Sequence, residues 1–140
     1  MVLIAWYGGQ AHGLHTARPL QRALLYSGWA LFQEFLTQSF MFVRLEAVLR
    51  SPWAVICTAL LFSLAHLPNP LLTPATLVAG LVFSSVFQRY RNLYAVGLAH
   101  ALLGLALAVS LPESAIHHMR VGAAYGTYLL GINPMFLVDR

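Results

Sequence analysis

Two long stretches of this chain carry no charged side chain, and they restrict the folds that the chain can adopt. No Asp, Glu, Lys or Arg occurs from 51 to 88 or from 92 to 112. A helix crosses the hydrocarbon core of a bilayer with about 20 apolar residues, so each stretch is long enough to do so. Backbone in lipid must satisfy its own hydrogen bonds, and the two-residue alternation of a membrane strand is absent. The spans are therefore predicted to be helices.

The composition agrees with a membrane-embedded chain. Of 140 residues, 59% are hydrophobic and only 9% are charged, with a mean hydropathy of +0.71. A soluble domain usually carries about 25% charged residues. The net charge of +4 comes from eight arginines and no lysine, and no basic cluster with interleaved aromatic residues occurs. The expected partner is therefore the lipid bilayer and not nucleic acid.

The chain is expected to form one all-α integral-membrane domain over residues 1–140, a polytopic transmembrane bundle of about four spanning helices. The apolar pattern places these helices at about 20–49, 52–67, 74–90 and 93–111. Ser51 and Thr73 each precede a proline, the pattern of an N-cap followed by proline at the first helical position. The last part, 112–140, is expected to be an interfacial or additional short hydrophobic segment.

Glu34 lies in the middle of the apolar run 29–38, in a chain with only four acidic residues. Ionisable groups inside membrane-length segments are costly and usually functional. Such a carboxyl suits a general base or a neutral hydrogen-bond donor. A polar clamp between helices is the alternative. Gln38, four residues on, shares its helix face, whereas Gln33 lies about 100° round and points elsewhere.

Two histidines lie in apolar runs further along the chain. Phe62 and His66 are four residues apart, so the phenyl ring can pack against the imidazole. His100 borders a stripe of small residues that would let another helix approach closely, and so faces the bundle interior; the stripe is Gly97, Ala101, Gly104 and Ala108. Helix capping by His66, and a packing hydrogen bond from His100, are the structural alternatives.

In this order, Gln33-Glu34-x-x-x-Gln38, Phe62-x-x-x-His66 and His100 resemble the motifs of the CAAX-protease and bacteriocin-processing (CPBP or Abi) family. This family of intramembrane proteases includes the type II CAAX prenyl endopeptidases. The resemblance covers about residues 20–111. It implies an all-helical membrane bundle in which the motifs face a cavity, with glutamate and histidine activating a water that cleaves peptide bonds near the membrane.

The resemblance also implies a role for each matching residue. Glu34 and His66 would activate the water, His100 would stabilise the oxyanion, and Gln33 and Gln38 would orient the site. A divalent metal such as zinc, if bound, would be held by Glu34, His66 and His100.

The chain departs from the family pattern at three positions. Gln33 replaces the first glutamate of the family motif, and Gln38 replaces its arginine. Gly104 stands where the family has an asparagine, so one oxyanion donor is absent; a backbone group at Gly104 or a water could replace it. Because glutamine cannot act as a general base, Glu34 must supply the carboxylate if the protein is active.

Three functions are compatible with these residues. The first is an intramembrane endopeptidase acting on a peptide or transmembrane-segment substrate, in C-terminal processing or sorting of membrane-anchored proteins. The second is a catalytically degenerate member that binds membrane partners, and the third is a channel or transporter subunit with a proton relay. The expected location is the bacterial or archaeal cytoplasmic membrane, with the turns between helices one and two and between three and four inside.

Overall fold

The computed structural model describes residues 19–112, 115 and 117–130, and these residues form an all-helical structure, as expected. In chain order the elements are α2 (Pro19–Glu34), the π-helix η1 (Phe35–Phe42), α3 (Val43–Val48), α4 (Ser51–Leu64), α5 (Leu72–Tyr90), α6 (Leu93–Ser110), the 3-10 helix η2 (His117–Met119) and α8 (Ala123–Leu129). The expected segment 112–140 is thus described only up to residue 130.

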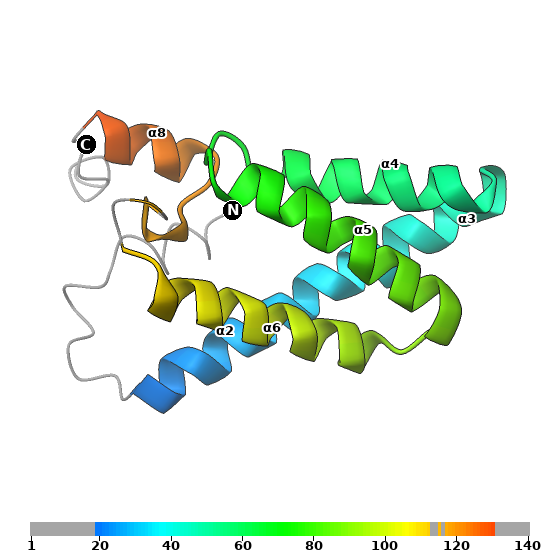
Figure 1. Cartoon of the computed structure of the whole chain (residues 1–140), viewed down its shortest axis with the longest axis horizontal. Helices are drawn as coiled ribbons and strands as arrows, with labels where there is room; N and C mark the ends of the chain where they lie inside the picture. The colour runs from blue at the N-terminus through cyan, green and yellow to red at the C-terminus, as the bar shows by residue number, and fades with distance from the viewer. Residues whose placement is uncertain (1–18, 113–114, 116, 131–140) are drawn as a thin grey trace, which may run out of the picture.

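The first long helix is interrupted by a π-helical segment directly after Glu34. α2, η1 and α3 follow one another along one rod, which agrees with the predicted helix at 20–49 (Figure 1). The amide of Val43 donates to the carbonyl of Gln38, five residues back, as in a π-turn. π-Helical turns are rare in proteins overall, and those that occur often lie at functional sites. Here the segment buries Thr37, Gln38 and Phe42.

The expected N-caps of the next two helices are wrong, although the helices exist. α4 begins at Ser51, and the capping residue is Arg50, with no side-chain cap; the Ser51 hydroxyl instead accepts a hydrogen bond from Gln88 at 2.7 Å. α5 begins before Thr73. The Oδ1 of Asn69 accepts hydrogen bonds from the first amides of this helix, at 2.9 and 3.1 Å, and so supplies the expected cap.

The last long helix matches its predicted bounds closely. Arg91 ends α5 in the left-handed conformation, and its amide donates to the carbonyl of Phe87. The Asn92 side chain then caps α6 by accepting a hydrogen bond from the amide of Ala95 at 3.0 Å. Pro112 follows the end of the helix, where a proline is expected.

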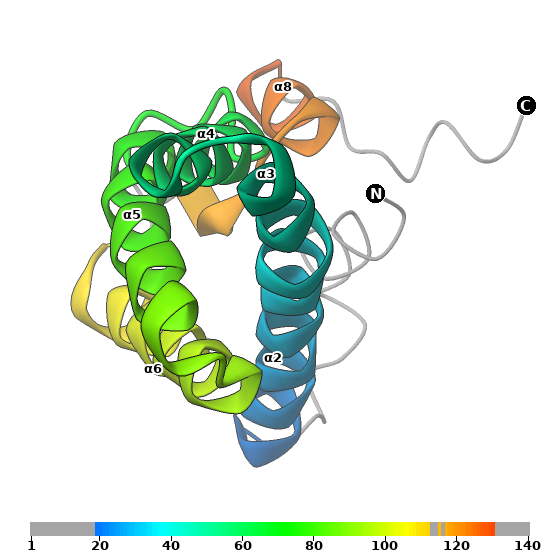
Figure 2. The ribbon, with the colours of Figure 1, turned by 90° about the vertical axis from the view of Figure 1, so that its right-hand side faces the viewer.

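Close approach between helices sets the arrangement of the bundle. α4 and α5 lie side by side, and a Cβ added at Gly80 of α5 would lie 3.0 Å from the Cα of Ala59 on α4 (Figure 1). α2 packs on α6, where Leu31 lies against Gly97. Seen end-on, α4, α5, α6 and the rod of α2 and α3 form a ring (Figure 2). The small-residue stripe of α6 is buried as far as Gly104, whereas Ala108 is exposed.

The outer surface of the bundle is strongly apolar. Each of α2, α4, α5 and α6 exposes large hydrophobic side chains, among them Leu24, Trp53, Val82 and Leu102. Within the described residues, only α6 is both long and apolar enough to cross a membrane by itself, and α4 is apolar but shorter. One of the four expected spans is therefore identified, and the polytopic arrangement remains a prediction.

The described end of the chain folds back onto the turn between α4 and α5. The amide of Gly122 donates to the carbonyl of Leu67 at 2.6 Å, and the Asn69 side chain donates to the carbonyl of Arg120 at 3.0 Å. Asn69 is fully buried and serves both the start of α5 and the docking of the segment 117–130. Figure 1 shows α8 beside this turn.

Candidate functional site

Glu34 is fully buried at the junction of α2 and η1, and each carboxylate oxygen has a partner. Oε1 lies 2.9 Å from Nδ1 of His100, and Oε2 accepts a hydrogen bond from Nε2 of Gln38 at 3.1 Å. The four-residue spacing that suggested a shared face for Glu34 and Gln38 therefore produces a direct hydrogen bond. A buried carboxylate is tolerated only when it is paired in this way.

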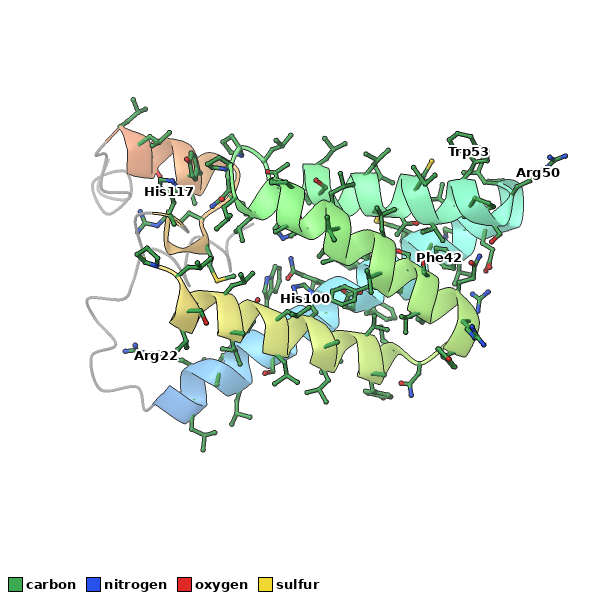
Figure 3. All side chains as sticks on the ribbon, viewed as in Figure 1. Arg22, Phe42, Arg50, Trp53, His100 and His117 are labelled. Atoms are coloured by element: carbon green, nitrogen blue, oxygen red, sulfur yellow. The ribbon has the colours of Figure 1, made fainter. Side chains whose placement is uncertain are left out.

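His100 points from α6 into the interior of the bundle (Figure 3). Phe83 stacks on its ring, with centroids 5.9 Å apart, and Phe62 meets it edge-on at 5.6 Å. An ionised Glu34 accepts hydrogen bonds only, and toward such a carboxylate Nδ1 of His100 is the donor. The aromatic contacts and the carboxylate together fix the imidazole and leave its Nε2 for another partner.

His66 lies just beyond the end of α4, near the other two ionisable groups. Its Nδ1 lies 2.7 Å from the carbonyl of Phe62, so Nδ1 carries the proton and Nε2 of the neutral ring holds a lone pair. Phe62 lies against both imidazoles, 4.8 Å from the ring of His66 and 5.6 Å from that of His100. None of the described hydrogen bonds joins His66 directly to Glu34 or His100.

Two buried polar atoms near these groups have no hydrogen-bond partner. One is Oε1 of Gln38, whose Nε2 donates to Glu34. The other is Oγ of Ser84, the residue after Phe83 on α5. Buried polar atoms in proteins are nearly always hydrogen-bonded, to protein or to ordered water. Gln38 therefore presents an unused acceptor next to the carboxylate, where a water or a polar substrate group would satisfy it.

The orientation of α2 favours Glu34 over Gln33 as the carboxylate of the site. Gln33 is only half-buried, and its carbonyl accepts a hydrogen bond from Thr37 at 2.8 Å. None of the described hydrogen bonds joins its side chain to His66 or His100. A supporting role for Gln33 thus remains a prediction, whereas Gln38 contacts the carboxylate directly.

Gly104 is buried, and the residue packed against it was not anticipated from the sequence. A Cβ added at Gly104 would fall on the hydroxyl oxygen of Tyr26 and lie 2.5 Å from its ring carbon Cζ. Tyr26, Ala30 and Glu34 are spaced four residues apart on α2, and this spacing was the available signal. The contributions of Phe83 and Ser84 had no comparable signal.

The polar groups of the site do not form a metal cage. Within the part of the chain that the structure describes, no three His, Cys, Asp or Glu side chains are placed to hold a metal ion. Glu34, His66 and His100, the ligands suggested if a metal is bound, are not grouped as such a site, and the mechanism proposed for the protein uses no metal.

Fold and site together define an all-helical bundle with an apolar exterior that buries a carboxylate–imidazole pair. A comparison with protein-family models matches residues 17–106, well over half of the chain, to the family Type II CAAX prenyl endopeptidase Rce1-like. The chain belongs to this family, which is a family of membrane-embedded proteases. Searches of curated proteins and of solved structures found no match.

Proposed function

We propose that this protein is an intramembrane endopeptidase in which Glu34, His66 and His100 hydrolyse a peptide bond with an activated water. The observation that supports this most is the buried pair formed by Glu34 and His100, 2.9 Å apart and enclosed by aromatic rings. Burying a charge in an apolar bundle is costly, and a purely structural pair could be replaced by apolar packing with little loss. Membership of a protease family supports the proposal that this pair is catalytic.

The bundle as a whole is proposed to lie in the membrane, with α2 to α6 as its spanning part. The large apolar side chains that all four long helical segments expose support this placement, because they would otherwise face water. Arg44, Arg50, Arg89 and Arg91 gather at the turns that join α3 to α4 and α5 to α6. Such arginines suit the cytoplasmic headgroups of a bacterial or archaeal membrane.

The proposed reaction begins with a water held at the carboxylate. One O–H of the water donates to Glu34, and the free Oε1 of Gln38 or the Nε2 lone pair of His66 accepts the other. The water oxygen adds to the peptide carbonyl carbon while its proton passes to the carboxylate, and the carbonyl electrons move to oxygen. In this proposal His100 carries a proton on both ring nitrogens, so that Nε2 donates to this oxyanion.

Collapse of the tetrahedral intermediate completes the proposed hydrolysis. The carbonyl double bond re-forms, the C–N bond breaks, and the proton held by Glu34 moves to the departing nitrogen. The products are an amine and a carboxylic acid, which ionises by passing its proton to the amine or to water, and Glu34 is restored to its starting state. The apolar surroundings strengthen each of these electrostatic contacts once the substrate has displaced water.

The substrate is proposed to be a membrane-anchored protein cleaved near its C-terminus, as in processing or sorting. The family name refers to a prenylated CAAX end, so a farnesylated peptide of that form is the first probe, beside an unmodified single-span peptide. The purified protein in liposomes is incubated with both probes in water enriched in heavy oxygen. Mass spectrometry then detects new carboxyl termini that carry the heavy isotope.

The test compares Glu34→Gln, His66→Ala and His100→Ala with the parent protein. Each should abolish isotope incorporation while the far-ultraviolet circular dichroism stays unchanged. Glu46→Gln is the matched control, because it makes the same change in a carboxylate outside the site. Full activity in Glu34→Gln contradicts the mechanism. Probe binding without cleavage by the parent protein would instead support a catalytically degenerate binding partner.

A further inference from the structure

The tip of Tyr26 occupies the place where residue 104 would carry its side chain. A Cβ at Gly104 would fall on the phenol oxygen, and it would lie 2.5 Å from Cζ and 2.9 Å from Cε1 of the same ring. The absence of a side chain at Gly104 is therefore what admits the hydroxyl between α2 and α6. Any larger residue at position 104 would displace the phenol.

The hydroxyl of Tyr26 lies at the interface between α2 and α6 that also contains the Glu34–His100 pair. Gly104 follows His100 by four residues, and both are buried, so they share the inward face of α6. Tyr26 precedes Glu34 by eight residues on α2, with the fully buried Ala30 between them. Neighbouring side chains at this spacing lie about 5–6 Å apart at Cβ, so the phenol is one helical turn from His100.

The proposed reaction needs a further hydrogen-bond donor near His100. Nδ1 of His100 already donates to Glu34, which leaves Nε2 as its single free position. Oxyanion sites gain most when several preorganised donors converge on the developing charge. A tyrosine hydroxyl carries a proton that it can donate to a hydrogen bond.

We infer that Tyr26 is a catalytic residue that donates a second hydrogen bond, beside His100, to the carbonyl oxygen of the substrate as it becomes an oxyanion. This inference rests on the proposed protease function. It also explains how the chain tolerates glycine at position 104, since the donor reaches the same place from the opposite helix. Ser84, with its unpartnered buried hydroxyl, is the competing donor.

The first experiment removes only the phenol oxygen of Tyr26. Tyr26→Phe should lower kcat by about 100- to 1,000-fold with little change in KM, the effect expected for loss of one oxyanion donor. Tyr94→Phe, at an exposed position on α6, is the matched control and should retain full activity. If Tyr26→Phe stays within threefold of the parent while Ser84→Ala loses activity, the assignment is overturned.

A second experiment keeps the test valid if Tyr26→Phe packs poorly. Tyr26→Ala empties the space above Gly104, and Gly104→Asn then places an amide donor there. The double variant should regain at least tenfold in kcat over Tyr26→Ala, whereas Gly104→Asn alone meets the phenol and should lose activity. No gain in the double variant overturns the inference. If His100→Ala is inactive but Tyr26→Phe is fully active, only the inference about Tyr26 is refuted. If His100→Ala is active, the protease mechanism itself is refuted.

Discussion

Replacing Gly80 by alanine should separate α4 from α5, and its cost can be worked out from the contacts. The added Cβ would lie 3.0 Å from Cα and 3.2 Å from Cβ of Ala59, and 3.4 Å from Cδ1 of Phe62. The nearest of these atoms is backbone, which cannot rotate away, so the two helices must move apart. Inserting one extra carbon into a well-packed core costs about 1–3 kcal/mol.

Gly28→Ala is the matched control, because a Cβ there has nothing within 4 Å. Both substitutions gain the same helix propensity, about 0.8–1.0 kcal/mol, so that contribution cancels between them. We therefore expect Gly80→Ala to be less stable than Gly28→Ala by about 1–3 kcal/mol, roughly 5- to 150-fold in the unfolding equilibrium. Gly28→Ala itself should be slightly more stable than the parent.

The measurement is reversible unfolding in mixed micelles with increasing sodium dodecyl sulfate, followed by far-ultraviolet circular dichroism. Peptide cleavage by Gly80→Ala should also fall, because a shift of α4 away from α5 would move Phe62, which lies against both imidazoles of the site. Equal unfolding free energies for the two alanine variants would refute the close packing of α4 on α5 that this reasoning assumes.

Three further predictions concern the ends of the helices. Hydrogen bonding to Arg91 lowers the pKa of Glu46, so their pair stabilises the fold at pH values above the ordinary carboxyl range, and this stability is lost as the pH falls through the lowered pKa. Glu46→Gln should therefore lower the free energy of unfolding by about 0.2–1 kcal/mol at pH 7 and leave it unchanged in strong acid. An equal loss at both pH values would contradict this prediction. Asn92→Ala should cost about 0.5–2 kcal/mol of unfolding free energy through loss of the α6 cap, whereas an unchanged micelle-unfolding midpoint would refute it. Asn69→Asp keeps the acceptor that caps α5 but loses the donor to the carbonyl of Arg120, so amide exchange in 117–130 should rise while α5 stays protected; unchanged exchange there would count against this docking.

The helices and the inward groups could be predicted because their signals are local. The charge-free stretch 92–112 and Pro112 at its end mark α6 within the chain itself, so its predicted bounds were close to those observed. The four-residue spacing of Glu34 and Gln38 was enough to place both on one face. Histidines in apolar runs then had few places to point except inward.

The remaining features depend on contacts between segments that are distant in sequence. The π-helical segment after Glu34 had no signal in the residue types of 35–42. Tyr26 meets Gly104 only because α2 crosses α6 at that point. Asn69, and not the expected Thr73, accepts hydrogen bonds from the amides at the start of α5, and its side chain also donates to the carbonyl of Arg120.

The central claim is that the carboxylate at position 34, and not one at position 33, serves the two histidines. The most direct test is the exchanged double variant Gln33→Glu/Glu34→Gln, which preserves composition and net charge, assayed for heavy-oxygen incorporation into both peptide probes. Because Gln33 is only half-buried and Glu34 lies 2.9 Å from His100, the account predicts that the exchanged variant folds but incorporates no isotope. Cleavage by the exchanged variant at the rate of the parent would contradict the account.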